Sequence, residues 1–364
     1  MTATASHHPA LHTAICDLFG VRYPIVQTGM GWVATPRLTA ATSNAGGLGV
    51  LASATLTVPE TEAAILATKE LTDKPFAVNM RGDAQDLGVR AQLLIRHGVK
   101  IASFALAPQE RIVRELKDAG LVVMPSIGAR RHAEKVAAWG VDAVIVQGAE
   151  GGGHTGSVPT SILLPQVVAA VDIPVIGAGG FNSGRGLVAA LAYGACGIAM
   201  GTRFLLTSDS LVPDNVKAEY LDRTVNDTVV TSVLDGVPQR ILRTELAEKL
   251  IRNNRLALLR SVRAARGFKK ISGASWAEIL REGLRMKKSH DLSWTQVIMA
   301  ANTPMMLKAS MVDGRTDLGT LASGQIVGLI DDLPSCSELI ARIMDEADEV
   351  LAQWTTEQNG GSPG

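Results

Sequence analysis

Eight short apolar runs, spaced roughly 20 to 30 residues apart, constrain the fold of this chain more than any other feature. The segments between them have helical periodicity, so each repeat has room for one strand, one helix and two loops. The runs are apolar throughout rather than alternating, as is typical of parallel strands that are covered on both faces. They occupy residues 24–28, 48–52, 76–79, 101–104, 121–126, 143–147, 174–178 and 197–200.

This repeat predicts an α/β fold, a single (β/α)8 TIM barrel over residues 15–204. An open, doubly wound sheet is the competing architecture. Because eight units come before any long interruption, closure into a barrel is favoured. Helices are expected between the strands, for example over residues 110–119, 132–139 and 186–193.

After residue 204 the repeat stops, and we expect a mostly helical insert over residues 205–310, near the barrel mouth. Between Arg240 and Lys288 there are 14 Lys or Arg residues against 4 acidic residues, although the whole chain has zero net charge. A charge run of this kind is usually a solvated helical face. Residues 311–354 are expected to return to the barrel and end in an amphipathic helix, and residues 355–364 to form a disordered tail.

The composition gives no sign of a nucleic-acid or membrane partner, because Lys plus Arg and Asp plus Glu are equal at 35 each. No stretch of about 18 uninterrupted apolar residues occurs, and the first residues have no apolar signal core. Cys16, Cys196 and Cys336 lie far apart and form no CxxC pair, which suits a reducing cytoplasm better than disulfides or a zinc site. We therefore expect a cytoplasmic protein without a bound metal. Self-association stays open, since nothing in the sequence fixes a symmetry.

Glycine-rich segments follow the last two predicted strands. Ile-Gly-Ala-Gly-Gly at 176–180 and Ala-Met-Gly-Thr-Arg at 199–203 each place backbone amides at the end of a strand, just before a helix. Barrels often bind phosphate at this point, because free N–H groups and the positive end of a helix favour an anion. The alternative is that these glycines only allow tight packing of helix on strand.

A histidine follows the sixth predicted strand, in the segment Gln-Gly-Ala-Glu-Gly-Gly-Gly-His-Thr-Gly at 147–156. A lone histidine is usually structural, but the loop around His154 is too rich in glycine to need a packed side chain. Imidazole can act as acid, base or hydrogen-bond donor near neutral pH. His154 is therefore the candidate catalytic residue, and the other histidines lie in the N-terminal segment or in helical or charged stretches.

Several segments together resemble the nitronate monooxygenase (2-nitropropane dioxygenase) family of FMN-dependent barrel oxidoreductases, which also includes flavin-dependent enoyl-acyl-carrier-protein reductases. The similarity spans residues 15 to 345. The matching segments are Pro-Ile-Val-Gln-Thr-Gly-Met-Gly at 24–31, Asn-Ala-Gly-Gly-Leu-Gly at 44–49, Asn79, residues 147–156 and 177–180, Met-Gly-Thr-Arg-Phe at 200–204 and Ser-Gly-Gln at 323–325.

The resemblance implies that FMN lies across the barrel mouth, with His154 matching the catalytic histidine of the family. The flavin ring would contact Gly29, Met30 and Asn79, and the phosphate would lie at Gly179, Gly180, Gly201 and Thr202. The full set of cofactor-binding residues expected on this basis is Gly29, Met30, Gly31, Asn79, Ser126, Gln147, Gly151, Gly152, Gly153, Ala178, Gly179, Gly180, Gly201, Thr202 and Gln325.

The similarity extends to an actinobacterial branch that acts in steroid C/D-ring catabolism on a bicyclic hydroxy-methyl-oxo-indene-carboxyl-CoA thioester. Segments of that branch are found at 32–34, 102–108, 204–210, 300–304 and 331–336. A CoA thioester carries a 3′-phosphate and a pyrophosphate, for which the basic block at 240–288 would supply Arg and Lys partners. Hydride transfer between flavin and such a thioester is thus the leading hypothesis.

Three alternatives stay open. The first is oxidation of alkyl nitronates with O2, as in the family's namesake reaction. The second is enoyl reduction driven by NAD(P)H, although the chain has no separate GxGxxG unit for a nicotinamide. The third is a flavin-binding protein without turnover.

Overall fold

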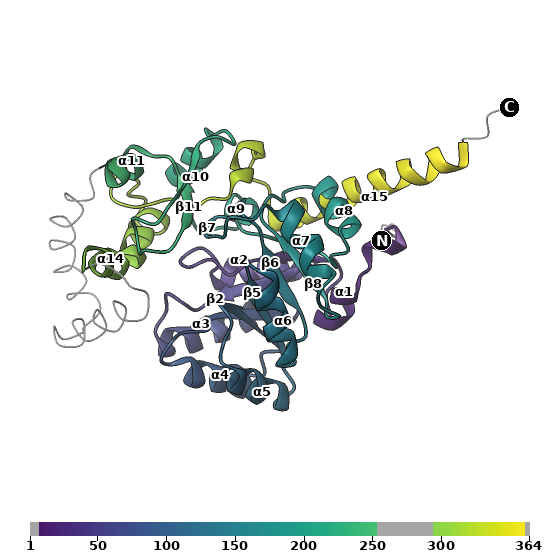
Figure 1. The fold of residues 1–364 in the computed structure, drawn as a ribbon, viewed down its shortest axis with the longest axis horizontal. Coiled ribbons are helices and arrows are strands. Elements are labelled where there is room, and N and C mark those ends of the chain that lie inside the picture. Colours follow the sequence, from purple (N-terminus) through teal and green to yellow (C-terminus); the bar gives the residue numbers. More distant parts are fainter. Residues whose placement is uncertain (1–6, 253–293, 361–364) are drawn as a thin grey trace. The chain divides into compact units, whose positions relative to one another are not determined.

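The computed structural model describes residues 7–252 and 294–360, and it divides into two compact units (Figure 1). The barrel unit consists of Met1–Gly151, Gly156–Leu211 and Leu329–Gly364. The insert unit consists of Gly152–Thr155 and Val212–Gly328. The chain therefore leaves the barrel unit twice, and the first departure takes only four residues.

Eight parallel strands form a closed barrel, which confirms the predicted fold and all eight predicted strands. The strand order follows the sequence, and β1 closes the ring by pairing with β9, where Ile25 lies opposite Ile198. The strands are short and almost entirely buried, as their uninterrupted apolar sequences indicate. They are β1 (Ile25–Gln27), β2 (Leu48–Ala52), β3 (Phe76–Arg81), β4 (Ile101–Ala105), β5 (Val122–Ile127), β6 (Val144–Gln147), β8 (Val175–Ala178) and β9 (Ile198–Met200).

One core cluster joins all eight strands to the N-terminal helix, which contributes Ile15 and Phe19. The helices that follow the strands begin and end within a few residues of the predicted bounds. For example, α3 begins with a capping box in which the Thr57 hydroxyl and the Glu60 carboxylate each bond the other's backbone amide. The helical segments of the barrel unit are η1 (Pro9–Leu11), α1 (Ala14–Phe19), α2 (Pro36–Asn44), α3 (Val58–Leu71), α4 (Leu87–Arg96), α5 (Glu110–Asp118), α6 (Arg130–Ala138), α7 (Thr160–Val168), α8 (Gly184–Ala192), α9 (Thr202–Leu205) and α15 (Cys336–Gly360).

The long helix α15 packs against α8 and α2. A Cβ added at Gly184 would lie 2.4 Å from the Ile343 carbonyl oxygen, so glycine allows α8 and α15 to approach closely. The helix continues to residue 360, beyond residue 355 where the disordered tail was expected to begin, and residues 361–364 lie outside the described residues.

The insert unit contains a small antiparallel sheet that the sequence analysis did not expect, beside the helices that it did. The strand order is β10 (Thr228–Thr231), β11 (Gln239–Leu242) and β7 (Gly153–His154). The helical segments are α10 (Asp214–Leu221), α11 (Glu245–Arg252), α14 (Trp294–Met311) and η2 (Gln325–Leu329), which ends one residue into the barrel unit. Ten of the 14 basic residues between 240 and 288 lie in 253–293, outside the described residues.

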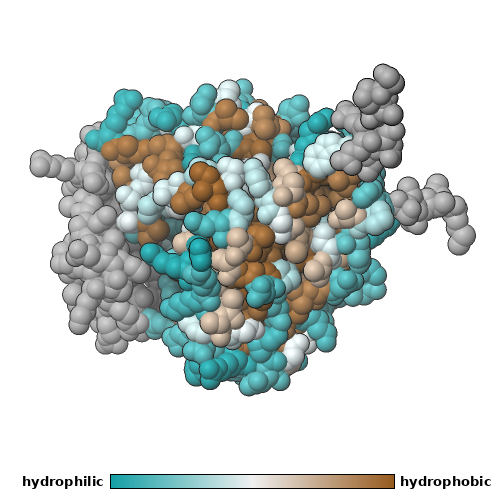
Figure 2. All heavy atoms as spheres, turned by 45° about the vertical axis from the view of Figure 1, so that its right-hand side comes forward, coloured by the Kyte–Doolittle hydropathy of each residue, from teal (hydrophilic) through white to brown (hydrophobic). Residues whose placement is uncertain are grey.

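One face of the molecule carries apolar side chains in several patches, with more hydrophilic residues between them (Figure 2). Within residues 7–252 and 294–360, no helix combines the length and the apolar character needed to cross a lipid bilayer.

Candidate active site

The loop after β1 approaches β3 so closely that only glycine fits. A Cβ added at Gly29 would lie 2.4 Å from the Cβ of Asn79. The Asn79 side chain is buried and donates from Nδ2 to the Ser103 hydroxyl, at 3.1 Å, on β4. The carboxyl ends of β1, β3 and β4 are therefore fixed against one another around this amide, at the end of the barrel where TIM-barrel enzymes place their active sites.

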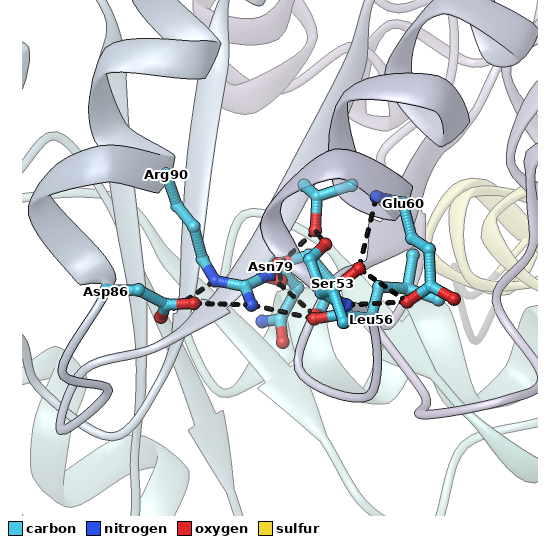
Figure 3. A network of polar contacts seen from close by, with 8 residues as sticks. Ser53, Leu56, Glu60, Asn79, Asp86 and Arg90 are labelled. Carbon is cyan, nitrogen blue, oxygen red and sulfur yellow. Dashed lines mark hydrogen bonds and ion pairs between the residues drawn. The ribbon is translucent and has the colours of Figure 1, made fainter. Parts of the chain in front are cut away.

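A buried arginine fixes the neighbouring loop, between β2 and α3 (Figure 3). Arg90 projects from α4, and its guanidinium holds the loop through two carbonyl groups and also donates to a hydroxyl group in the first turn of α3. Within that loop Ser53 donates from both its amide (3.0 Å) and its hydroxyl (2.8 Å) to the carbonyl oxygen of Asn79. The partners of the guanidinium are Ser53 O (2.9 Å), Thr61 Oγ1 (2.7 Å), Leu56 O (2.7 Å) and the Asp86 carboxylate (2.8 and 2.9 Å).

The loop after β6 is held by a carboxylate at the start of α7. Glu150 accepts from the Thr160 amide at 2.9 Å and from the Thr160 hydroxyl at 2.8 Å. An acidic side chain at a helix N-terminus is favourable both as a cap and through the helix dipole. Thr160 Oγ1 also lies 3.0 Å from the Gly179 carbonyl oxygen, and the Gly148 amide donates to Ala178 at 3.0 Å. The loops that follow β6 and β8 are therefore joined.

Gly179 and Gly180 follow β8 with positive φ angles of 94° and 85°, a conformation that favours glycine. Among the described residues, neither of their amides donates to a protein acceptor. Gly180 is exposed, and a Cβ there would approach only Glu150, at 3.7 Å. Two neighbouring amides at a strand end that have no protein partner are suited to bind an anion.

The loop after β9 lies beside the loop after β1. A Cβ at Gly201 would be 3.2 Å from Thr28 Oγ1 and 3.4 Å from Met30 Sδ. The next cation along the chain, Arg203, does not point to an open site. Its buried guanidinium donates to the Asp332 side chain at 2.9 Å and to the Leu206 carbonyl oxygen at 2.6 Å.

His154 lies in the insert unit, where β7 pairs with β11 so that His154 is opposite Gln239. Its Nε2 lies 2.6 Å from Oδ2 of Asp235, in the turn between β10 and β11. Burial alone would raise the pKa of the Asp235 carboxyl. The hydrogen bond and charge of His154, together with the Val237 amide, lower that pKa below its usual value. Asp235 is thus held as a carboxylate.

The predicted site residues divide between the two units, and each unit brings its own members together. In the barrel unit, Gly29 lies against Asn79, Gly151 against Gln147 and Gly179, and Gly201 against Met30. In the insert unit, a Cβ at Gly152 would lie 2.5 Å from the amide of Gly324, next to Gln325. The barrel unit holds Gly29, Met30, Gly31, Asn79, Ser126, Gln147, Gly151, Ala178, Gly179, Gly180, Gly201 and Thr202, and the insert unit holds Gly152, Gly153, His154 and Gln325.

The sequence analysis did not find Asp235, although one signal was available. Asp235-Gly236 lies between Thr-Val-Val-Thr at 228–231 and Gln-Arg-Ile-Leu at 239–242, a pattern typical of a β-hairpin. The pattern predicts the turn but not its partner, since His154 lies 81 residues earlier. Within the part of the chain that the structure describes, no group of three or more His, Cys, Asp or Glu side chains is arranged to hold a metal ion.

Comparison with known proteins agrees with this architecture. The family model for nitronate monooxygenase matches residues 12–93 and 84–346. A (3aS,4S,5R,7aS)-5-hydroxy-7a-methyl-1-oxo-octahydro-1H-indene-4-carboxyl-CoA dehydrogenase of Rhodococcus jostii is 60% identical over 338 residues, which cover 93% of this chain and 96% of that protein. A dehydrogenase of the same name from Mycobacterium tuberculosis is 59% identical over 341 residues, with the same two coverages.

Among solved structures, FabK from Thermotoga maritima is similar over 95% of this chain and 99% of its own, with a TM-score of 0.78 and 31% sequence identity. The family match and these relatives extend through both the barrel strands and the insert. The protein is therefore an oxidoreductase, and it belongs to the nitronate monooxygenase family.

Proposed function

We propose that this protein is an FMN-dependent dehydrogenase of a bicyclic hydroxy-methyl-oxo-indene-carboxyl-CoA thioester, an intermediate of steroid C/D-ring degradation. The observation that carries the proposal is the identity of 59–60% to two dehydrogenases named for this substrate, over 93% of the chain. The free cysteines Cys16, Cys196 and Cys336 support a reducing cytoplasm as the setting.

The residues at the barrel mouth fit FMN in the arrangement that the family resemblance implies. The amides of Gly179 and Gly180, which have no acceptor among the described residues, would donate to the phosphate together with Gly201 and Thr202. The Gly29–Met30 backbone and the Asn79 side chain would contact the flavin ring. Fixed amides suit this task because they need no rearrangement when the anion binds.

Bound flavin would supply a two-electron acceptor for a hydride from a substrate C–H bond. The protein would bind and orient the thioester so that this C–H bond faces the flavin. Positioning of this kind would raise the rate of hydride transfer. His154 would take the proton that must leave the substrate with the hydride, so that a double bond forms in the product.

The CoA part of the substrate requires cations. Of the four described basic residues in the block at 240–288, Lys249 and Arg252 already pair with Glu245 and Glu248 on their own helix. Pairs of this kind on an exposed helix face are ordinary i,i+4 contacts. On the sequence pattern, the phosphates of CoA would be bound by Arg and Lys of the block at 240–288, of which the residues from 253 onward lie outside the described residues.

A second candidate function is oxidation of alkyl nitronates with O2, which the match to the nitronate monooxygenase family favours. A nitronate is small and carries one negative charge, so it would not need the basic block. Enoyl reduction with NAD(P)H is a third candidate, which the resemblance to a family that includes flavin-dependent enoyl-acyl-carrier-protein reductases supports.

Anaerobic mixing separates the three. The purified flavoprotein is mixed with the bicyclic CoA thioester, with propionate 3-nitronate or with NADPH, and flavin absorbance near 450 nm is followed. Fast bleaching by the thioester and not by the nitronate is the expected result. Bleaching by the nitronate alone would replace the proposal with the second candidate, and bleaching by NADPH alone with the third.

A further inference from the structure

We propose that Asp235 is a positioning residue for His154, so that the insert, and not the barrel, fixes the acid–base group. The inference rests on the proposed function, in which His154 takes a proton from the substrate. It assigns the β10–β11 hairpin a catalytic task in addition to any contact with CoA.

The two side chains lie close together, and Asp235 is much more buried than His154. His154 Nε2 lies 2.6 Å from Asp235 Oδ2, and the Asp235 side chain is 13% exposed whereas that of His154 is 52% exposed. The second carboxylate oxygen, Oδ1, accepts from the Val237 amide at 3.1 Å. Both oxygens of Asp235 are therefore engaged, and the carboxylate has a fixed direction while the imidazole stays accessible to a substrate.

The turn that carries Asp235 is itself anchored. Leu234 is buried in a cluster with Ile241, Ala247 and Leu250, and its carbonyl oxygen accepts from Thr303 Oγ1 at 3.1 Å. The following residue, Gly236, has a φ of +85° and donates from its amide to the Ser232 carbonyl oxygen at 2.9 Å. Asp235 is therefore flanked by two anchored residues, Leu234 and Gly236. A residue that orients a catalytic side chain needs such a rigid support.

The same hairpin also fixes the backbone of the histidine. His154 is opposite Gln239 and Gly153 is opposite Arg240 in the antiparallel pairing of β7 with β11. The Thr155 amide donates to the Pro238 carbonyl oxygen at 3.1 Å. Backbone and side chain of His154 are therefore both held by residues 235–240, although His154 itself directly follows the glycines at 151–153.

The geometry selects one tautomer of the imidazole. A carboxylate only accepts, so Nε2 must carry a proton, and in the neutral ring Nδ1 then has the lone pair. Nδ1 is thus the atom that takes the substrate proton. The flavin that these residues would hold would accept a hydride from one substrate carbon, and the proton of the neighbouring carbon or oxygen would pass to Nδ1. A C=C or C=O bond would form in the substrate, and the resulting imidazolium would face the Asp235 carboxylate, which would stabilise its charge.

The test compares His154→Ala, Asp235→Asn and the double variant, all loaded with FMN, by single-turnover reduction with the bicyclic CoA thioester. Asp235→Asn should slow the reduction on the order of 10²- to 10⁴-fold with little change in the thioester concentration that gives the half-maximal rate, as expected when only the orientation of a base is lost. The double variant should be no slower than His154→Ala, because Asp235 acts through His154. The control Asp317→Asn removes an exposed ion pair with Arg315 in the same unit and should leave the rate unchanged.

A second measurement does not depend on turnover. Nitrogen-15 NMR of the unmodified FMN-loaded protein should show the His154 ring as the Nε2–H tautomer, with the signal identified by its loss in His154→Ala. An Nδ1–H tautomer, or an Asp235→Asn rate equal to that of the unmodified protein while His154→Ala is slow, would overturn the inference and leave the proposed function intact. A normal rate for His154→Ala would instead overturn the role of His154 in the proposed function.

Discussion

Gly29 lies against the side chain of Asn79 so closely that a Cβ at residue 29 would stand 2.4 Å from the Asn79 Cβ and 2.7 Å from its Cγ. The Asn79 side chain is buried and donates a hydrogen bond to Ser103 on β4. It would have to break this bond to move away from residue 29. The loop after β1 and the end of β3 therefore form one fixed surface, on which the proposed flavin ring would lie.

This contact predicts that Gly29→Ala disturbs both folding and FMN binding. The added methyl group must displace the Asn79 side chain, and overpacking of this kind costs about 1–3 kcal/mol. FMN affinity, measured by fluorescence titration of the apoprotein, should fall along with the melting temperature. Gly88→Ala is the matched control: a Cβ there meets nothing within 4 Å, and alanine is favoured over glycine in α4 by up to about 1 kcal/mol.

The Arg90 network predicts a large loss of stability for Arg90→Met. The methionine would leave Asp86 without its cation and two loop carbonyl groups without their donor. Because Asp86 is 38% exposed, the ion pair is only partly buried, and most of the cost comes from the unpaired carbonyl groups, at about 1–3 kcal/mol for each buried polar group left without a partner. Urea unfolding measures the change. Arg114→Met is the control, because Arg114 is 71% exposed and its pair with Glu110 is worth at most about 1 kcal/mol. Equal effects of the two variants would show that the network does not hold the loop.

The lowered pKa of the Asp332 carboxyl predicts that the folded protein loses stability in acid. Burial alone would raise the pKa of this carboxyl, but Arg342 and Arg203 lower it below its usual value. A lowered folded-state pKa means that the stabilisation is complete above the unfolded-state pKa, about 3.9, and is lost as the pH falls through the folded-state pKa. Asp332→Asn should therefore be less stable at pH 7, by about 1–3 kcal/mol because Asp332 is 38% exposed and the pair is only partly buried. The difference from the unmodified protein, followed by thermal unfolding, should shrink below about pH 4. A difference that stays constant to pH 3 would contradict this explanation.

The different burial of the three cysteines predicts that only one of them is alkylated in the native protein. Burial raises the pKa of the Cys336 thiol to about 12 and also raises the pKa of Cys16, so both are almost entirely unreactive thiols at neutral pH. Cys196 is only partly buried and lines a groove of about 500 Å³ together with residues of α8 and α15. Iodoacetamide should modify Cys196 alone in the native protein and all three cysteines in urea, as intact-mass spectrometry would show. Modification of Cys336 under native conditions would contradict the burial argument.

The barrel strands could be predicted because a parallel strand that is covered on both faces has a short, uninterrupted apolar sequence. The run at 48–52 matches β2 residue for residue, and the others differ by at most a few residues at their ends. The glycines of the mouth could be located for the same reason, since they follow strands whose order was known. The short strand β7 could not be found, because Gly153 and His154 have neither β-branched nor aromatic side chains and form a strand only beside β11.

The partner of His154 lay beyond prediction for a different reason. Periodicity and turn chemistry are local, whereas the contact of His154 with Asp235 joins residues 81 positions apart. The anchoring of Asn79 by Ser53 and Arg90 is likewise a product of packing between β2, β3 and α4. The sequence thus predicts which residues follow the ends of the barrel strands, and the tertiary contacts decide how each is held.

Closure of the barrel has a consequence for synthesis on the ribosome. Ile25 on β1 pairs with Ile198 on β9, so about 170 further residues must be made before β1 meets its second neighbour. At about 5–20 residues per second this takes roughly 9 to 35 s, during which the nascent chain carries an open, apolar strand edge. The ring of strand ends that forms the mouth cannot exist earlier than the translation of β9. The last barrel strand to be made, β9, therefore sets the earliest time at which a newly synthesised chain could bind the proposed cofactor there.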